Sequence, residues 1–257
     1  MARHLPAFLI HKRIMIPSDT ESSHESSRNS SGNRQDSETP RTHCIRCGTC
    51  CLKGGPTLHL EDRDLLAKGI IKRSDLYTIR EGETVFDNIR GNASALAGEI
   101  IKIKGQGKGY SCIFYDEGQK GCRIYANRPV ECCVLKCWDT KDIKAVSGKN
   151  RLARKDLIPP DNPVAQLIAA HEQRCSYLAL EKLIERIGGP DATEAVEKVI
   201  EQLQFDHHLR SVVVERSPLA NEEMDFLFGR PLATTIKMFG LQVRQKDKGF
   251  LLTPIAQ

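Results

Sequence analysis

The distribution of cysteine constrains this chain more than any other feature of its sequence. Nine of the ten cysteines fall between residues 44 and 137 of a chain of 257 residues. So dense a cluster of thiols needs a chemical explanation, and metal binding and disulfide bonding are the two to compare. The clustered residues are Cys44, Cys47, Cys50, Cys51, Cys112, Cys122, Cys132, Cys133 and Cys137.

Several observations favour metal binding over disulfide bonding. Disulfide frameworks belong mainly to small secreted domains, whereas this chain is long and its clustered cysteines are odd in number. The opening residues contain only a four-residue apolar run at 7–10, followed by basic residues at 11–13. This run is too short for the apolar part of a secretion signal. We therefore expect a reducing, cytoplasmic environment in which clustered thiols bind metal.

Composition divides the chain into three segments. Residues 18–37 contain eight serines and no apolar residue, so nothing there offsets the conformational entropy lost on ordering. We predict a disordered serine-rich leader over residues 1–42, a cysteine-cluster metal-binding domain over 43–160 and a mainly helical region over 161–257. With 40% hydrophobic residues the chain can form a core. No apolar stretch approaches the roughly 18–20 residues that a membrane span requires, so no membrane partner is expected.

Local patterns in the cysteine-rich part predict short elements. Acidic residues followed by a glycine stop indicate a helix over 61–69. Residues 99–104 and 110–115 are typical of strands, with a glycine-rich break at 105–109 between them and a turn at 116–121 after them. These elements predict an α+β fold, with a small metal-stapled core of short strands, turns and helices before a mainly helical C-terminal part.

Helical periodicity dominates after Pro163. Apolar residues recur near a 3.6-residue period as far as Ile187 and predict one helix that ends at the Gly-Gly-Pro of 188–190. Asp191 and Glu194 resemble a capping box and predict a second helix reaching about residue 203. Short helices are expected over about 205–240 and a terminal strand over 248–252.

The first cysteine array has the pattern C-x2-C-x2-C-C over residues 44–51. Two-residue spacing lets thiolates converge on one ion, and Gly48 gives the turn the backbone freedom it needs. Cys50 and Cys51 are neighbours whose side chains diverge in extended backbone. One of them therefore serves a different metal atom or site, or is a core thiol. The second array, from Cys112 to Cys137, is specific only in combination with the first.

Ligand counting leaves the number and kind of sites open. A closed zinc site and a cubane 4Fe-4S cluster each take four protein ligands, so nine cysteines can fill two sites and leave one over. The alternative is a single site with the remaining thiols buried, and we favour two sites. Sulfur donors exclude calcium and magnesium, which need oxygen ligands. The C-x2-C-x2-C spacing favours iron because it is similar to the ferredoxin run, but Cys51 departs from that run and zinc remains an alternative.

Both arrays together carry a resemblance to a known family. They read Cys44-x2-Cys47-x2-Cys50-Cys51, then Cys112, then Gly121-Cys122-x-Ile124-Tyr125-x2-Arg128-Pro129-x2-Cys132. Over about residues 43–140 this pattern resembles the YkgJ-type cysteine-cluster family, described as carrying a zinc- or iron-chelating CxxCxxCC domain, and flagellin lysine methylases have a similar cluster. The resemblance implies metal chelation by Cys44, Cys47, Cys50, Cys51, Cys112, Cys122 and Cys132. It leaves the last ligand open, because Cys133 stands where an arginine is usual and Cys137 lies beyond it.

Other side chains are candidates for supporting roles. A proline follows Arg128 and moves it out of the helical region, where its guanidinium can donate hydrogen bonds to the sulfurs of a cluster. A solvated arginine in a surface turn is the alternative. His43 and His59 are possible zinc ligands, but with so many cysteines we expect them to be solvated or hydrogen-bonded. Tyr125 is expected in the core, and Cys175 as a small buried apolar side chain.

Three functions are compatible with these patterns. We favour a cytoplasmic metal-binding protein that chelates iron, as an iron–sulfur cluster, or zinc, with metal ions as its partners and a helical region that serves as scaffold or as docking surface for a protein. The second is an iron–sulfur-dependent enzyme that modifies a protein, as the methylase relatives do. The third is a zinc-stabilised nucleic-acid-binding module that uses the seven basic residues of 136–155, although a solvated face is the simpler interpretation and the net charge of +5 is modest. The first is favoured because the sequence has no phosphate-binding loop, dinucleotide fingerprint or C-x3-C-x2-C radical motif.

Overall fold

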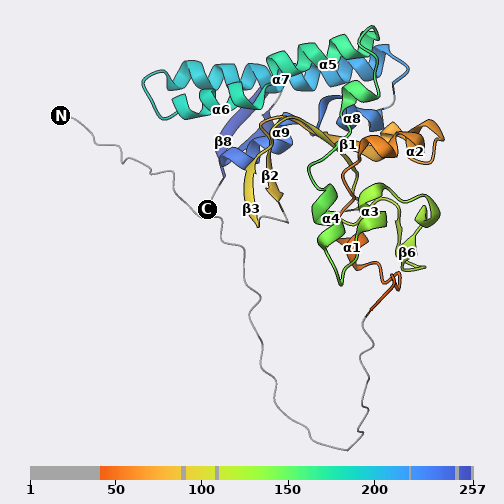
Figure 1. Ribbon diagram of the computed structural model, residues 1–257. Helices are drawn as coiled ribbons and strands as arrows, with labels where there is room; N and C mark the ends of the chain where they lie inside the picture. The colour runs from red at the N-terminus through yellow and green to blue at the C-terminus, as the bar shows by residue number, and fades with distance from the viewer. Residues whose placement is uncertain (1–40, 88–90, 108–109, 220, 247–248, 256–257) are drawn as a thin grey trace, which may run out of the picture. The chain divides into compact units, whose positions relative to one another are not determined.

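The computed structural model describes residues 41–87, 91–107, 110–219, 221–246 and 249–255. Almost all of the leader predicted for residues 1–42 lies outside these ranges. Residues 41–257 form one unit in which short helices and short strand pairs precede a set of longer helices, as Figure 1 shows. The fold class is therefore α+β, as predicted, with a helical C-terminal part.

The elements are short in the first half of the chain and longer in the second. The helices are α1 (Thr49–Leu52), α2 (Arg63–Ala67), α3 (Val130–Val134), α4 (Lys141–Val146), α5 (Pro163–Arg174), α6 (Tyr177–Arg186), α7 (Ala192–Arg216), α8 (Met224–Phe228) and α9 (Leu232–Thr235). The strands are β1 (Leu76–Ile79), β2 (Thr84–Asp87), β3 (Asn92–Ala95), β4 (Ile100–Ile103), β5 (Tyr115–Asp116), β6 (Gly121–Cys122), β7 (Leu241–Lys246) and β8 (Gly249–Pro254). In the described part of the chain every strand has a single antiparallel partner.

The β1–β4 pair forms the apolar centre of the cysteine-rich part. Its register places Leu76 opposite Ile103 and Ile79 opposite Ile100, so branched apolar side chains pack across the two strands. The segment before α2 joins this pair, because the N–H of Leu58 donates to the carbonyl of Ile101 at 2.9 Å. Leu152 then donates its N–H to the carbonyl of Leu58, also at 2.9 Å. Leu58 is thus bonded directly to β4, and Leu152 is linked to the same strand through Leu58.

In the first half of the chain, the predictions are confirmed for elements that neighbouring residues in the sequence determine. The helix expected over 61–69 is a 3-10 turn followed by α2, and it ends near Gly69, whose φ is 69°. The strand expected over 99–104 is β4, and the turn at 116–121 connects β5 to β6. The strand expected over 110–115 is wrong except at its last residue. A turn replaces it, because the N–H of Tyr115 donates back to the carbonyl of Cys112 at 2.8 Å.

The long helix predicted after Pro163 is broken into two. The N–H of Cys175 closes α5 on the carbonyl of His171, and Ser176 then takes an extended conformation. The hydroxyl of Ser176 accepts the N–H of Ala179 and caps α6. Asp191 precedes α7 as predicted but makes no side-chain cap, and α7 runs to Arg216, well past the predicted end.

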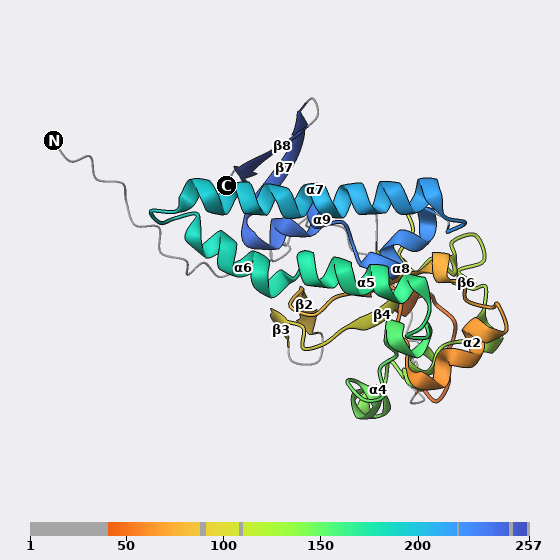
Figure 2. The same cartoon turned by 90° about the horizontal axis from the view of Figure 1, so that it is seen from above.

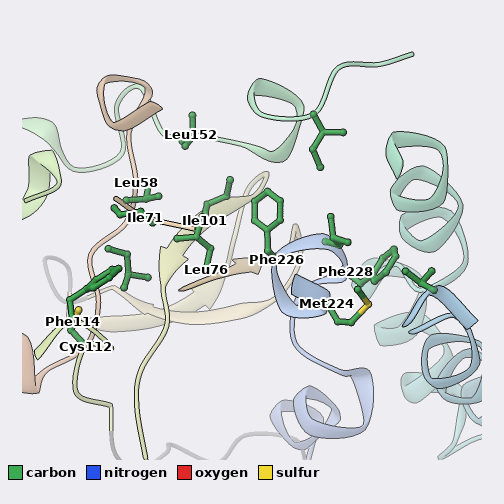
Figure 3. Close-up of a cluster of buried hydrophobic side chains, with 14 of the residues drawn as sticks. Leu58, Ile71, Leu76, Ile101, Cys112, Phe114, Leu152, Met224, Phe226 and Phe228 are labelled. Carbon is green, nitrogen blue, oxygen red and sulfur yellow. The ribbon is translucent and has the colours of Figure 1, made fainter. Parts of the chain in front are cut away.

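The larger hydrophobic core joins the cysteine-rich part to the helical part. Figure 3 shows Leu76 and Ile101 from the β1–β4 pair beside Phe226 and Phe228 from α8, all of them buried. Cys112 lies at the edge of the same cluster. The core thus contains residues from both sides of position 160. The predicted boundary between a cysteine domain and a helical region at that position stays a prediction.

A second core lies between the long helices and the C-terminal hairpin. It contains Tyr177 and Leu180 of α6, Val199 and Leu203 of α7, and Ile236. Val213, near the other end of α7, belongs to the first core. Figure 2 shows α7 lying alongside both α5 and α6. No helix in the described ranges is both long enough and apolar enough to cross a bilayer.

Candidate metal centre

The first cysteine array lies in and just before a single helical turn. α1 follows Gly48, whose φ of 77° lies in the left-handed region that glycine adopts without strain. The same residue packs against Tyr115, since a Cβ added to Gly48 would lie 2.5 Å from a carbon of that ring. Glycine therefore allows the array to approach β5. In this array Cys44, Cys47 and Cys50 are exposed and Cys51 is half-buried.

Backbone hydrogen bonds bring two distant cysteines to the array. The N–H of Cys112 donates to the carbonyl of Cys51 at 2.8 Å. Cys122 on β6 pairs with Tyr115 on β5, the residue against which Gly48 packs. Cys112 is buried and Cys122 is half-buried. The second array thus meets the first through the short β5–β6 pair.

A fourth segment, α3, contributes Cys132. Burial raises the pKa of the Cys132 thiol well above its usual range, and the nearby charges of Cys112, Cys50 and Cys122 raise it further. Burial also raises the pKa of Cys112, again with contributions from Cys122 and Cys50. These thiols therefore lie within range of one another's charges. We call the neighbouring set the inner thiols: Cys50, Cys51, Cys112, Cys122 and Cys132.

Cys50 differs from the other inner thiols because its pKa is lowered. A hydrogen bond from the thiol of Cys51 lowers the pKa of Cys50 to about 6, against the opposing effect of burial and with help from the charge of Arg128. The same hydrogen bond raises the pKa of Cys51. The lowered pKa favours the thiolate form of Cys50, which is the form that binds metals.

The remaining clustered cysteines are exposed and lie outside this set. We call them the outer thiols: Cys44, Cys47, Cys133 and Cys137. Arg41 connects two of them, because its Nη1 donates to the sulfur of Cys137 at 3.3 Å and its charge helps to lower the pKa of Cys47. The main cause of that lowered pKa is a hydrogen bond with the hydroxyl of Thr49. The thiol of Cys133 donates to the carbonyl of Arg128 at 3.3 Å.

The donor chemistry of the inner thiols fits a soft or borderline metal. Within the described ranges, no three cysteine, histidine, aspartate or glutamate side chains converge tightly enough to form a ready-made coordination site. Protonated thiols have no electrostatic reason to converge, and ionised ones repel each other. A metal that replaces the protons would draw the sulfurs together, since thiolates bind zinc and iron directly. Five neighbouring sulfurs supply the four ligands that zinc or a cubane cluster takes.

Arg128 lies beside the inner thiols. Its guanidinium stacks on the ring of Tyr125 at 3.8 Å, and Arg46 stacks on the same ring at 3.9 Å. The Nε of Arg128 is buried and has no hydrogen-bond partner among the described residues. The charge of Arg128 also lowers the pKa of Cys50. These contacts place a cation at the edge of the inner thiols, and sequence reasoning did not find the contribution of Arg46.

The histidines of this region have other partners. His59 is buried, with Nδ1 2.8 Å from the carbonyl of Lys149 and Nε2 3.3 Å from the carboxylate of Glu131. Both partners only accept, so both ring nitrogens donate and neither is left for a metal. The hydrogen bond to Glu131 accordingly raises the pKa of His59. His43 is exposed beside Thr42, and the structure gives it no contact with the inner thiols.

Cys175 is separate from the cluster. It is completely buried in the second core, where burial raises its pKa to about 12. Its thiol donates to the carbonyl of Gln202 at 3.8 Å. The expectation of a small buried side chain is confirmed, and Cys175 provides a natural control for the clustered cysteines.

The basic stretch over 136–155 does not present all of its charges to solvent. Arg154 is buried and pairs with Glu99 and Glu172. Lys136 pairs with Asp142 at 2.6 Å. These ion pairs reduce the charge that the stretch could offer to an anion, so nothing in the structure supports the nucleic-acid-binding alternative.

Comparison with known proteins gives one family match, in the cysteine-rich segment. Residues 43–152 match the family model CxxCxxCC, whose description is "Putative zinc- or iron-chelating domain". No curated protein and no solved structure gives a significant match. The matched segment contains all of the inner and outer thiols, and it ends where Leu152 bonds to Leu58.

Proposed function

We propose that the chain chelates zinc or iron through its inner thiols, because residues 43–152 match the family model CxxCxxCC. The four proposed ligands are Cys50, Cys112, Cys122 and Cys132. Each comes from a different segment, namely α1, the turn before β5, strand β6 and α3. The observation that carries the proposal is the contact between the two arrays: the N–H of Cys112 donates to the carbonyl of Cys51, and Cys122 pairs with Tyr115, against which Gly48 packs. The charges of Cys112, Cys50 and Cys122 also act on Cys132. A tetrathiolate formed in this way joins segments that are far apart in sequence, as structural metal sites commonly do.

Cys51 and Arg128 are assigned supporting roles at this centre. Cys51 donates a hydrogen bond to the sulfur of Cys50 and holds the backbone of Cys112 through its carbonyl. Arg128 supplies a positive charge beside Cys50, and its unpartnered Nε can donate to a metal-bound sulfur. Such contacts orient ligands and raise metal affinity.

The outer thiols suggest a second, more exposed site. Cys44, Cys47, Cys133 and Cys137 supply four further sulfurs, and Arg41 connects Cys137 with Cys47. Their exposure would make a metal bound there more accessible to exchange than one bound by the inner thiols. We accordingly propose two metal sites: a tightly binding site formed by the inner thiols and a more labile site formed by the outer thiols.

Iron is the favoured metal, in the form of an iron–sulfur cluster. The support for this is the C-x2-C-x2-C spacing of residues 44–50, which is similar to that of ferredoxins. This run contributes Cys50 to the inner thiols and Cys44 and Cys47 to the outer thiols, so it supports iron at both proposed sites. All ten cysteines are free thiols, which is consistent with a reducing, cytoplasmic environment.

Purification without oxygen, with iron, zinc and acid-labile sulfide measured per chain, tests the identity of the metal. Equal iron and sulfide with a visible absorption band supports a cluster, whereas colourless protein that carries zinc supports a tetrathiolate zinc site.

Two serine variants test the ligand assignment. Cys132→Ser removes an inner thiol and should abolish the firmly bound metal and destabilise the matched segment, because ligation and folding are linked. Cys175→Ser removes a fully buried thiol from the second core and should leave the metal content unchanged. If both variants keep the wild-type metal content, the inner thiols are not the ligands. If the wild-type protein contains neither zinc nor iron under these conditions, the function itself is wrong.

A further inference from the structure

Arg46 has a backbone conformation that is unusual for its residue type. Its φ is 56°, in the left-handed region that residues other than glycine rarely adopt and in which a side chain is strained. Arg46 lies between Cys44 and Cys47, two of the outer thiols. Strained residues of this kind persist only where the surrounding structure holds them, and they gather at functional sites. The contacts of Arg46 must therefore offset the cost of its conformation.

The backbone of Arg46 bonds to the first of these cysteines. Its N–H donates to the sulfur of Cys44 at 3.4 Å. The sulfur of Cys47 lies 3.2 Å from the hydroxyl of Thr49, with which it shares a hydrogen bond. Hydrogen-bonding groups beside ligand sulfurs orient them and support metal binding. Both sulfurs of the segment 44–47 therefore have such a group in contact.

The side chain of Arg46 stacks on a ring of the second array. Its guanidinium lies 3.9 Å from the centre of the Tyr125 ring, and the guanidinium of Arg128 lies 3.8 Å from the same centre. Such cation–π contacts are attractive, and more so where the ring is partly shielded from water, as the half-buried Tyr125 is. The carbonyl of Arg128 also accepts the thiol of Cys133 at 3.3 Å. The ring therefore links the segment 44–47 to the part of the chain that carries Cys133.

Few other contacts hold the segment 44–47. In the part of the chain that the structure describes, no backbone hydrogen bond joins these four residues to another segment. All four residues are exposed. Arg41, which precedes them, adds a bond from its Nη1 to the sulfur of Cys137 at 3.3 Å. The stack on Tyr125 is therefore the contact that attaches the segment itself to the second array.

We propose that Arg46 is a positioning residue for the outer thiols, which holds the segment 44–47 in its metal-binding conformation by stacking on Tyr125. The inference rests on the proposed function, and within it on the more labile site. Without the stack Arg46 should relax to an ordinary φ, which moves Cys47 relative to Cys44 because φ sets the direction in which the chain leaves Arg46. Only a fraction of the chains would then be ready to bind, and the apparent affinity of the site falls in proportion to that fraction.

Arg46→Met tests this in the full chain, because it removes the cation and keeps an unbranched side chain. Zinc is titrated in competition with a chromophoric chelator, which gives separate affinities for the first and second equivalents. The melting temperature of the metal-free protein is measured in parallel. We expect the affinity for the second equivalent to fall about 3- to 10-fold, the contribution of one such stack. The affinity for the first equivalent, bound by the inner thiols, and the metal-free melting temperature should not change.

Lys120→Met is the matched control. Lys120 is another exposed cation in the left-handed conformation, with a φ of 49°, in the turn between β5 and β6. Among the described residues no aromatic ring stacks on it. This variant should leave both zinc affinities at their wild-type values. An equal loss in Lys120→Met and Arg46→Met would mean that any lost cation weakens the site, and it would overturn the proposal.

Two variants of Tyr125 separate the stack from other roles of Arg46. Tyr125→Phe keeps the face of the ring and should keep the wild-type affinity for the second equivalent. Tyr125→Leu removes the ring from both Arg46 and Arg128 and should lose more affinity than Arg46→Met. Adding Arg46→Met to Tyr125→Leu should then have no further effect, because the partner of Arg46 is already gone. Additive losses in the double variant would show that Arg46 does not act through the ring.

The remaining outcomes distinguish the inference from the proposed function. Wild-type affinity for the second equivalent in Arg46→Met overturns the inference alone. A lowered metal-free melting temperature with weakened binding of both equivalents also overturns it, because that result indicates a structural role. A wild-type protein that binds a single zinc overturns the more labile site and the inference together and leaves the inner thiols as ligands. A wild-type protein that binds neither zinc nor iron overturns the proposed function as well.

Discussion

Gly48 combines two constraints that a side chain would violate. Its φ of 77° is unfavourable for other residues, and a Cβ would lie 2.5–2.9 Å from three atoms of Tyr115. Gly48→Ala should therefore destabilise the metal-loaded protein by more than the roughly 1–2 kcal/mol of left-handed strain alone. It should also lower the metal content, because the first array must move away from β5. Urea unfolding and metal analysis measure both effects.

Gly69 is the matched control for Gly48. Its φ is 69°, but no atom lies within 4 Å of an added Cβ. Gly69→Ala should show only the left-handed strain and keep its metal. Equal losses of stability in the two variants would mean that the contact between Gly48 and Tyr115 does not constrain the array.

Asp206 is a buried carboxylate whose ionisation stabilises the helical part. Burial alone would raise its pKa, but hydrogen bonding from His171 and the charge of Arg210 hold the pKa at about 2. Its oxygens accept from His171 Nε2 at 2.8 Å, from Arg210 Nε at 2.8 Å and from the N–H of Leu232 at 2.9 Å. The carboxylate therefore joins α5, α7 and the start of α9.

This lowered pKa predicts a loss of stability in acid. The unfolded chain binds a proton at Asp206 near its ordinary value of 3.8, so the contribution is fully present above pH 4 and is lost as the pH falls through about 2. The shift corresponds to about 2 kcal/mol. Urea unfolding of the metal-free protein between pH 2 and pH 6 should show a shallower acid dependence for Asp206→Asn than for wild type. Glu197→Gln, which changes an exposed carboxylate on the same helix, should leave the slope unaltered, and a wild-type slope in Asp206→Asn would contradict the assignment.

Among the helices and strands, those determined by the pattern of neighbouring residues could be predicted from the sequence. Those determined by contacts between residues far apart in the chain could not. β4 and the helix that begins at Pro163 follow from apolar runs and periodicity that are visible in the sequence. The break at Ser176 depends on one hydroxyl hydrogen bond, and the turn at 112–115 depends on Cys112 bonding to Cys51 far away in the chain. The candidate ligand cysteines could be identified from the sequence. Their division into inner and outer thiols could not, because it depends on burial and contacts that only the folded structure shows.

Arg154 connects three elements on both sides of residue 160. Its guanidinium binds Glu99 before β4, Glu172 of α5 at 2.7 Å and the carbonyl of Leu227 in α8. Arg154→Met leaves two partly buried carboxylates without this partner and should cost about 3 kcal/mol in the free energy of unfolding. Lys155→Met, which changes the exposed neighbour, should cost little. A chemical denaturation series on both proteins measures the difference, and equal midpoints would show that Arg154 does not join these elements.

For the whole molecule, the shared core predicts cooperative unfolding. The first core takes residues from the matched segment and from α7 and α8, so the cysteine-rich and helical parts should melt in one transition. Because a metal bound by the inner thiols stabilises only the folded chain, a chelator should lower that single melting temperature and metal should restore it. Calorimetry with and without chelator is the measurement. Two separate transitions, with only one of them metal-sensitive, would instead support independent domains divided near residue 160.

The 25-residue helix α7 contributes to both cores, Val199 and Leu203 to one and Val213 to the other. At 1.5 Å per residue it is about 37 Å long and too stiff to bend sharply without a proline or glycine in its interior. A tilt imposed where α7 meets the first core must therefore also move the part of α7 on which β8 packs, where His207 lies against Phe250. A displacement of the helix near the inner thiols would in this way be transmitted through α7 to the β7–β8 hairpin.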